Sequence, residues 1–335
     1  MMTLDKQTPA LLRVQDLQKN FQVRKGLLGR KIQTLKAVDR LTFDLKRGET
    51  LGLVGESGCG KTTAGKTILR LYEPDGGQIV FDGTDVVGAS DKQMLALRRQ
   101  MQIVFQDPYD SLNPRKSVEQ TLGEPMLYHR IVERRHLRER IAYLMTLVGL
   151  PTACMNRYPH EFSGGQRQRI VIARALCLEP KFIVCDEAVS SLDVSIQAQI
   201  INLLQDLQAQ LALTFLFISH DLRVVKHISD RVAIMYLGKI IELGNTSEIY
   251  ATPLHPYTQA LLSAIPVADP FNQPERIILS GDVPTPTRLP KGCRFHTRCW
   301  LKEEICLREE PAFGEVANGH YVMCHLVHRS KEVSG

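Results

Sequence analysis

One short segment constrains the fold of this chain more than any other. Eight consecutive residues fit the phosphate-loop pattern G-x-x-x-x-G-K-[ST] at every fixed position. They are Gly55, Glu56, Ser57, Gly58, Cys59, Gly60, Lys61 and Thr62. An apolar stretch, 50–54, precedes the loop and residues 63–71 read as a helix, so a strand–loop–helix unit is expected. Glycines let backbone N–H groups close around phosphate oxygens, and the segment therefore predicts a nucleoside triphosphate site.

Individual residues of this unit have expected roles toward the triphosphate. Lys61 is expected to reach the β- and γ-phosphates, and the Thr62 hydroxyl to hold Mg²⁺. The amino end of the helix adds positive potential there, and we count Thr63 among the nucleotide-binding residues.

Composition and charge limit the class of protein. The 335 residues allow one large or two ordinary domains, and a hydrophobic share of 44% is enough for a sizeable core. The formal net charge of +6 is mild, and many basic residues lie between positions 24 and 47. We interpret them as a solvated face, with an approach to acidic lipid headgroups as the alternative. The sequence has no basic platform interleaved with aromatic residues, which argues against nucleic-acid binding.

Two absences bear on the compartment. No run of about 18 apolar residues occurs, so we expect no membrane-spanning helix. Residues 1–10 lack the basic and then apolar layout of a secretory signal. We therefore expect the eight cysteines to be reduced thiols or metal ligands and not disulfides.

Strands and helices are expected on both sides of the phosphate loop. Four apolar segments in the first third of the chain read as strands: 11–14, 41–45, 78–81 and 101–105. The first two suggest an antiparallel sheet, and the last ends at Gln106. From 107 to about 165, prolines are followed by helical periodicity, which predicts a helical subdomain inserted into the nucleotide-binding core.

A helix start with two glycines follows this region. Ser163 and Gln166 have the spacing of a capping box, which predicts a helix from Ser163 to Leu176. Gly164 and Gly165 lie in the first turn, where glycine weakens a helix. Glycines are expected there if a phosphate must approach the backbone closely.

Polar side chains follow the next two strands. Asp186 and Glu187 come after a continuous apolar run, 182–185, that is typical of a strand buried on both faces. Ligands bind at the carboxyl ends of such strands in open α/β sheets. We expect Asp186 to support Mg²⁺ and Glu187 to orient or deprotonate the attacking water. His220 follows a second buried strand, 214–218, at the same edge, which favours contact with the γ-phosphate over a purely structural role.

The last third of the chain divides near residue 250. Residues 196–211 read as an amphipathic helix, and 231–243 as a β-hairpin. Prolines crowd the chain after Tyr250, which predicts a boundary and a separate tail that is poor in regular structure.

The order of these motifs resembles a known family. The phosphate loop, the segment 162–166, the pair Asp186-Glu187 and His220 follow one another as in the ATP-binding cassette of ABC transporters. The likeness covers roughly residues 11–244. It implies an α/β P-loop NTPase fold with a RecA-like parallel sheet, an antiparallel β subdomain and an inserted helical subdomain. The expected domains are a cassette at 1–250 and a tail domain at 251–335.

The resemblance assigns roles to further residues. Phe21 matches the aromatic residue that stacks on adenine. Gln106 matches the glutamine that contacts Mg²⁺ or water and senses the membrane partner. Asp193 matches the D-loop aspartate, and His220 the switch histidine. The family signature closes on the γ-phosphate of ATP held by the opposite subunit, and it is matched by Ser163, Gly164, Gly165 and Gln166.

Two positions depart from the family pattern. Phe162 stands where leucine is usual, and we expect this position to tolerate the larger side chain. Ala188 stands where proline is usual, so we expect a looser loop with both carboxylates still in place.

Four segments narrow the resemblance to the ATP-binding subunits of binding-protein-dependent dipeptide and oligopeptide importers, and favour the second of their two nonidentical ATPases. They are 105–109, 111–115, 123–125 and 255–262. The resemblance implies ATP and Mg²⁺ as cofactors and a homologous ATPase subunit as heterodimer partner. It also implies two membrane permease subunits, a peptide-binding protein acting through them, and a position on the cytoplasmic face of the inner membrane.

Other functions remain as alternatives. Importers of nickel, glutathione or antimicrobial peptides use similar cassettes. Soluble ABC ATPases usually carry two cassettes or long coiled-coil insertions, and this chain has neither. A GTP-binding switch would need an Asn-Lys-x-Asp segment, which the sequence lacks.

The tail contains four closely spaced cysteines: Cys293, Cys299, Cys306 and Cys324. Their spacing fails the common ferredoxin patterns and lacks the tight pairs of most zinc sites, so spacing alone identifies no metal. Free thiols are one alternative. Zinc is another, because three histidines lie nearby: His296, His320 and His325. In the peptide-importer family the tail can carry four cysteines that ligate a [4Fe–4S] cluster. The four cysteines match that tail, as do Phe295 and Arg298, so the resemblance implies the cluster.

Overall fold

The computed structural model describes residues 10–25, 31–266, 275–317 and 319–328. Residues 26–30, part of the basic stretch between 24 and 47, lie outside this description, as does part of the proline-rich tail. The chain divides into two units. Unit 1 comprises residues 1–46, 50–87 and 219–335, and unit 2 comprises 47–49 and 88–218.

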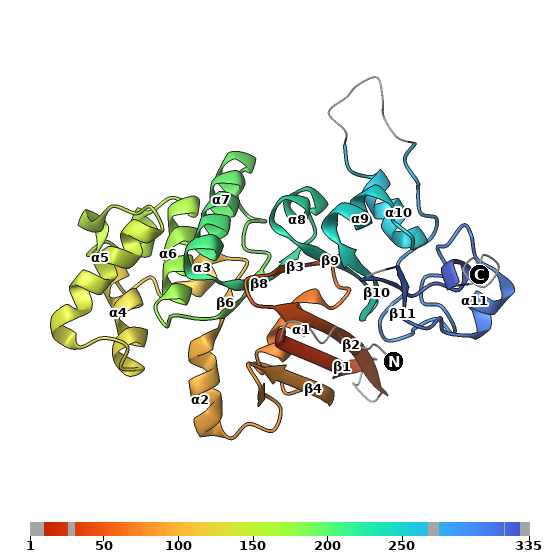
Figure 1. The fold of residues 1–335 in the computed structure, drawn as a ribbon, viewed down its shortest axis with the longest axis horizontal. Coiled ribbons are helices and arrows are strands. Elements are labelled where there is room, and N and C mark those ends of the chain that lie inside the picture. Colours follow the sequence, from red (N-terminus) through yellow and green to blue (C-terminus); the bar gives the residue numbers. More distant parts are fainter. Residues whose placement is uncertain (1–9, 26–30, 267–274, 318, 329–335) are drawn as a thin grey trace. The chain divides into compact units, whose positions relative to one another are not determined.

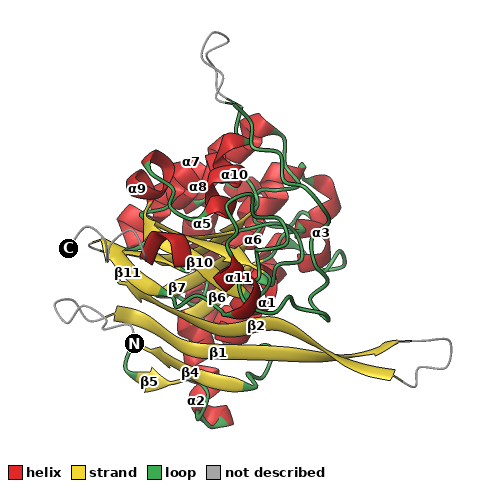
Figure 2. Ribbon diagram, turned by 90° about the vertical axis from the view of Figure 1, so that its right-hand side faces the viewer, coloured by secondary structure: helices red, strands yellow, loops and turns green. Residues whose placement is uncertain are grey.

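Unit 1 contains an antiparallel sheet with the strand order β2-β1-β4-β5 (Figure 2). Its strands are β1 (Ala10–Lys25), β2 (Lys31–Lys46), β4 (Gly76–Phe81) and β5 (Thr84–Asp85). Alternate residues such as Leu12 and Val14 in β1, and Leu41 and Phe43 in β2, are fully buried, as expected for a sheet with one covered face. The predicted antiparallel sheet is confirmed, but β1 and β2 are each 16 residues long and much longer than the sequence indicated.

A second set of strands in unit 1 supports the phosphate loop. β3 (Thr50–Val54) pairs in parallel with β9 (Arg231–Tyr236), and β9 turns into β10 (Lys239–Asn245) as the predicted hairpin. The tail adds β12 (His320–Val322) to the edge of β10, and β11 (Gly314–Ala317) pairs with β12. The helices of this unit are α1 (Lys61–Ile68), α8 (Leu222–Ile228), α9 (Thr246–Ala251), α10 (Pro256–Ser263) and α11 (Glu304–Arg308). The tail is therefore joined to the sheet, although its regular elements are short.

Unit 2 is built on the parallel strands β6 (Met101–Val104), β7 (Phe182–Asp186) and β8 (Thr214–Ser219), of which β8 ends at the boundary with unit 1. β7 and β8 are buried along their whole length, as the continuous apolar runs predicted. The predicted helix after β7 is α7 (Val194–Leu211). α2 (Asp91–Gln100), which precedes β6, was not anticipated from the sequence.

The segment between β6 and β7 is helical. It contains α3 (Pro108–Ser111), α4 (Val118–Tyr128), α5 (Leu137–Leu147) and α6 (Gly164–Leu176), with short 3-10 helices η1 (Arg134–His136), η2 (Thr152–Cys154) and η3 (Pro159–Glu161). α4, α5 and α6 contact one another (Figure 1) through buried side chains such as Leu122, Ile141 and Leu144. Among the helices that the structure describes, none has both the length and the apolar character needed to span a bilayer.

A buried carboxyl group joins the tail to the hairpin of unit 1. Glu242 in β10 is fully buried and accepts hydrogen bonds from the N–H groups of Leu254 (2.7 Å) and His255 (3.0 Å). Its other contact is the Nε2 atom of His320 in β12, at 2.8 Å. Burial lowers the pKa of His255 to about 4, and its Nδ1 accepts the Tyr257 N–H at the start of α10. Glu242 thus connects three segments of the chain.

We expect Glu242→Ala to lower the free energy of unfolding by about 3–5 kcal/mol, because it leaves two buried N–H groups and a buried imidazole without their partner. Glu242→Gln keeps one acceptor and should cost about 1–3 kcal/mol. The exposed Glu248 in α9 provides the control, with a change of about 0.5 kcal/mol or less for Glu248→Ala. Urea unfolding measures all three values. Equal losses for Glu242→Ala and Glu248→Ala would contradict the assignment.

Candidate functional site

The phosphate loop connects β3 to α1 in unit 1 and is confined by neighbouring backbone. Gly60, the N-cap residue of α1, has a φ of 108°, and a Cβ on it would lie 2.0 Å from the carbonyl oxygen of Ala37 in β2. A Cβ on Gly55 would lie 2.2 Å from the carbonyl oxygen of Met235 in β9. Side chains larger than hydrogen do not fit at either position. The loop conformation therefore depends on glycine at both ends.

The side chain of Lys61 lies within this loop. It is only 4% exposed, and its Nζ donates to the carbonyl oxygens of Gly55 (2.7 Å) and Glu56 (3.0 Å). Burying an ammonium group is costly unless it has partners, and the two carbonyls supply them. A phosphate would be a stronger partner because a hydrogen bond between two charged groups is stronger than one to a neutral carbonyl. Thr62 and Thr63 lie beside it in the first turn of α1, both half-buried.

Two other predicted nucleotide contacts also lie in unit 1. Phe21 in β1 meets the ring of Tyr72 edge to face, with centroids 5.6 Å apart, and the Lys19 ammonium lies 5.4 Å from its centroid. His220 is exposed, directly after β8 and before Asp221, which caps α8. The contacts of Phe21 with adenine and of His220 with the γ-phosphate remain predictions.

The acidic pair lies at the carboxyl end of β7 in unit 2, as predicted: Asp186 is the last residue of the strand and Glu187 follows it. Asp186 is 5% exposed. Glu187 is half-buried, and its N–H donates to the Ile218 carbonyl of β8 at 3.0 Å. Its φ of 50° is in the left-handed region, which costs a residue with a Cβ about 1–2 kcal/mol. Such strain concentrates at functional sites. Nothing in the sequence pattern indicated it.

The signature segment forms the start of α6 in unit 2. The capping box is present: Ser163 Oγ accepts from the Gln166 N–H (3.3 Å), and Gln166 Oε1 accepts from the Ser163 N–H (3.0 Å). A Cβ on Gly165 would lie 2.6 Å from Cγ2 of Ile196 in α7, so close helix packing is a second reason for glycine here. The close approach of a phosphate to both glycines remains a prediction. At Gly164 an added Cβ would make an ordinary contact at 3.5 Å, so packing gives no separate reason for glycine there.

Gln106 and the D-loop lie beside each other in the same unit. The Gln106 carbonyl accepts a hydrogen bond from Ser191 Oγ at 3.4 Å, two residues before Asp193. Asp193 is exposed at the amino end of α7 and makes no capping bond with its side chain. Leu192 lies between Ser191 and Asp193 in the chain, and its Cδ2 atom would lie 3.5 Å from a Cβ on Gly164. Unit 2 therefore brings Gln106, the signature and the D-loop together.

The predicted nucleotide contacts are thus divided between the two units. The phosphate loop, Phe21 and His220 belong to unit 1, and the acidic pair, Gln106, the signature and Asp193 belong to unit 2. Each set has the local geometry described above. The meeting of both sets around one triphosphate stays a prediction.

The four tail cysteines lie near one another in unit 1. The Cys293 N–H donates to the Cys306 carbonyl at 2.9 Å. Burial, together with the three neighbouring thiols, raises the pKa of Cys293 to about 12. Burial and neighbouring thiols also raise the pKa values of Cys299 and Cys324. Within the described residues, however, no three His, Cys, Asp or Glu side chains have an arrangement that could hold a metal ion.

The three histidines considered as zinc ligands have other partners. The ring of His296 contacts the Cys293 carbonyl at 2.8 Å, and His320 contacts Glu242. The Nε2 atom of His325 lies 3.0 Å from the Glu309 carbonyl. This leaves the four thiols as the candidate donors by residue type, because thiolates ligate both iron–sulfur clusters and zinc, although their arrangement in the described part of the tail forms no metal site.

Comparisons with known proteins agree with this geometry. Residues 38–190 match the family model described as ABC transporter, and residues 241–306 match the one described as oligopeptide/dipeptide transporter, C-terminal region. The oligopeptide transport ATP-binding protein AppF of Bacillus subtilis is 54% identical over 94% of this chain and 97% of its own length. A Brucella ovis protein with the provisional name of a peptide import ATP-binding protein is 52% identical, over 95% of this chain and 98% of its own length.

Solved structures share the fold. The cbiO1 protein of Clostridium perfringens, part of the ABC transporter complex cbiONQ, is 29% identical with a TM-score of 0.63. The likeness covers 72% of this chain and 91% of that one.

We expect Lys61→Ala to weaken MgATP binding by about 10- to 100-fold, because the phosphates lose a buried cation. A fluorescent ATP analogue displaced by ATP measures the dissociation constant. The exposed Lys92 in α2 is the control, and Lys92→Ala should bind like the wild type. Unchanged affinity in Lys61→Ala would show that the loop does not hold the triphosphate.

Proposed function

We propose that this chain, which belongs to the family of ABC transporter ATP-binding proteins that serve oligopeptide and dipeptide import, hydrolyses ATP to power the uptake of short peptides. The match of residues 241–306 carries the peptide assignment, because that model is described as the C-terminal region of oligopeptide/dipeptide transporters and lies outside the match to the general ABC model. Identity over almost the full length of AppF supports the same activity for the whole chain.

The chemistry follows from residues already placed in the fold. ATP and Mg²⁺ are the cofactors: Lys61 binds the β- and γ-phosphates, while Thr62 and Asp186 hold Mg²⁺. Glu187 orients or deprotonates the attacking water. His220 contacts the γ-phosphate.

Gln106 contacts Mg²⁺ or the water and senses the permease, and Phe21 stacks on adenine. The signature and Asp193 act on ATP held by a partner subunit, so hydrolysis needs two ATPase chains. We propose that the partner is a homologous, nonidentical ATPase. The pair docks on two permease subunits at the cytoplasmic face of the inner membrane, and a peptide-binding protein delivers the substrate. The cassette comprises residues 1–250, with its helical subdomain at 107–165, and the tail domain comprises 251–335.

A growth experiment tests substrate and catalyst together. Deleting the gene should abolish growth on a dipeptide as the sole source of a required amino acid, while the free amino acid restores growth. The wild-type gene should rescue the deletion. Glu187→Gln should not, because it binds MgATP but hardly hydrolyses it. The exposed Glu248 gives the matched control, and Glu248→Gln should rescue fully.

Two results would contradict the proposal. Rescue by Glu187→Gln would remove Glu187 from catalysis. Normal peptide uptake in the deletion strain, together with a defect in nickel or glutathione uptake, would assign the chain to a sister importer.

We further propose that Cys293, Cys299, Cys306 and Cys324 bind a [4Fe–4S] cluster. The mutual proximity of the thiols and the engagement of the nearby histidines favour a site made of the four thiols alone. The family resemblance of the tail favours the cluster over four-thiolate zinc. Thiolate–iron bonds would cross-link a segment that has little core of its own.

Protein purified without oxygen should be brown and contain about four irons per chain. Cys299→Ser should bleach the colour. Cys154, a half-buried thiol in unit 2, is the control, and Cys154→Ser should retain the colour. A colourless preparation with one zinc, or with no metal, would exclude the cluster.

A further inference from the structure

The phosphate loop contains an acidic residue whose charge opposes the binding of a polyanion. Glu56 follows Gly55 directly, and its own carbonyl oxygen is one of the two that hold Lys61. A carboxylate in this position adds negative potential where phosphates must bind, and like charges repel strongly in a partly buried site. The loop therefore needs a counter-ion for Glu56. Lys61 and Thr62 do not provide one, because their expected partners are the phosphates and Mg²⁺.

The tail supplies that counter-ion. Nη1 of Arg298 lies 2.9 Å from one carboxylate oxygen of Glu56 and 3.1 Å from the other. The Arg298 side chain is 9% exposed and that of Glu56 is 27% exposed, so the pair is shielded more than a surface ion pair. The Nε atom of Arg298 is buried and has no hydrogen-bond partner. Glu56 is thus the ionic partner of this guanidinium, which also interacts with the hydroxyl group of Tyr236.

An aromatic cluster fixes the segment that bears Arg298. Phe295 is fully buried against Tyr236 of β9 and Tyr257 of α10, with ring centroids 5.4 Å away in each case. Tyr257 also accepts a hydrogen bond from the Glu56 N–H at 3.0 Å. Both the backbone and the side chain of Glu56 are therefore held by residues beyond position 250.

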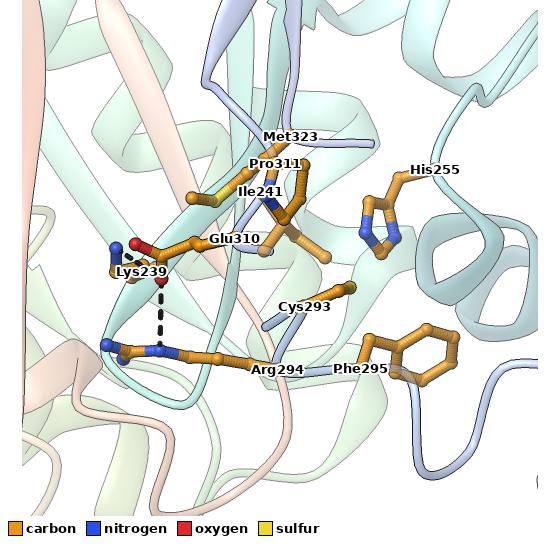
Figure 3. A pocket seen from close by; sticks show the side chains of 9 residues that line it. All are labelled: Lys239, Ile241, His255, Cys293, Arg294, Phe295, Glu310, Pro311 and Met323. Atoms are coloured by element: carbon orange, nitrogen blue, oxygen red, sulfur yellow. Dashed lines mark ion pairs between the residues drawn. The ribbon is translucent and has the colours of Figure 1, made fainter. Parts of the chain in front are cut away.

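A second arginine anchors the same segment. Arg294 donates to the Leu237 carbonyl and pairs with the Asp39 carboxylate. Figure 3 shows it approaching Glu310, which also pairs with Lys239 at 2.7 Å, beside a cavity of about 10 Å³. The ion pairs of Arg294 and Arg298, on either side of Phe295, hold the segment beside the phosphate loop.

We propose that Arg298 is a positioning residue of the nucleotide site, which neutralises and holds Glu56 so that the loop accepts phosphates. The tail is then part of the ATP site. This inference rests on the ATP binding of the proposed function, but not on the transported substrate.

The test measures MgATP affinity of the full chain, purified without oxygen, by displacement of a fluorescent ATP analogue. Arg298→Ala should weaken binding by about tenfold, because the Glu56 carboxylate is left unpaired beside the phosphates. Arg298→Lys keeps the positive charge and should stay within about threefold of the wild type. Arg308, which is exposed and pairs with Glu304 in the same tail, is the control, and Arg308→Ala should not change the affinity.

Two readouts separate charge compensation from simple destabilisation of the tail. The double variant Glu56→Gln/Arg298→Ala removes both charges and should recover most of the lost affinity. Raising the ionic strength from about 0.05 to 0.5 M should reduce the difference between Arg298→Ala and the wild type, because salt screens the repulsion. Thermal unfolding of each variant confirms that it is folded.

The proposal is overturned if Arg298→Ala binds MgATP like the wild type. It is also overturned if the double variant is as weak as Arg298→Ala, or if the difference is independent of salt. A failure of peptide uptake would instead refute the proposed transport function and leave this result standing, because affinity is measured on the purified chain without any transported substrate.

Discussion

The arrangement of unit 1 depends on backbone contacts that leave the phosphate loop no room for side chains at its ends. The carbonyls of Ala37 and Met235 occupy the space that a Cβ on Gly60 or Gly55 would need. Within the loop, the carbonyl of Cys59 accepts a hydrogen bond from the Gly238 N–H, in the turn after β9, at 2.9 Å. β2, β9 and the turn after β9 therefore line the loop directly, although β9 is distant from it in sequence.

The same turn connects the loop to the tail. Arg294 binds the Leu237 carbonyl, and the Asp39 N–H donates to the Gly238 carbonyl at 2.9 Å. Burial acts to raise the pKa of Asp39, but the neighbouring Arg294 and Lys239 cations lower it overall. This group of charges is enclosed and compensated, which is the condition under which buried ions are tolerated. It gives the tail a structural role beside the nucleotide loop that is independent of any metal.

Most of the core was predictable from sequence because its signals are local. The loop pattern, the apolar runs of β7 and β8 and the capping box at Ser163 each specify their own structure within a few residues. α2 was missed because only Met94 and Leu97 are buried in it, although Ser90 and Gln93 form a capping box that could have revealed it. The outer part of β1 was missed for a similar reason, since exposed residues such as Gln22 and Val23 interrupt the alternation.

The parts that sequence reasoning could not reach depend on contacts between distant residues. No local pattern links Glu242 to His320, and none indicates that Gly165 packs against Ile196. The motifs identified the candidate nucleotide residues by type and order, but the left-handed backbone of Glu187 and the partner of Glu56 required coordinates.

The separation of Glu56 and Arg298 has a consequence for the newly synthesised chain. The two residues are 242 positions apart. At about 5–20 residues per second, translation needs on the order of ten seconds or more to add the second after the first. Until then the phosphate loop carries an uncompensated carboxylate. Under the role proposed for Arg298, a nascent or prematurely terminated chain that lacks this residue binds ATP about tenfold more weakly than the finished chain.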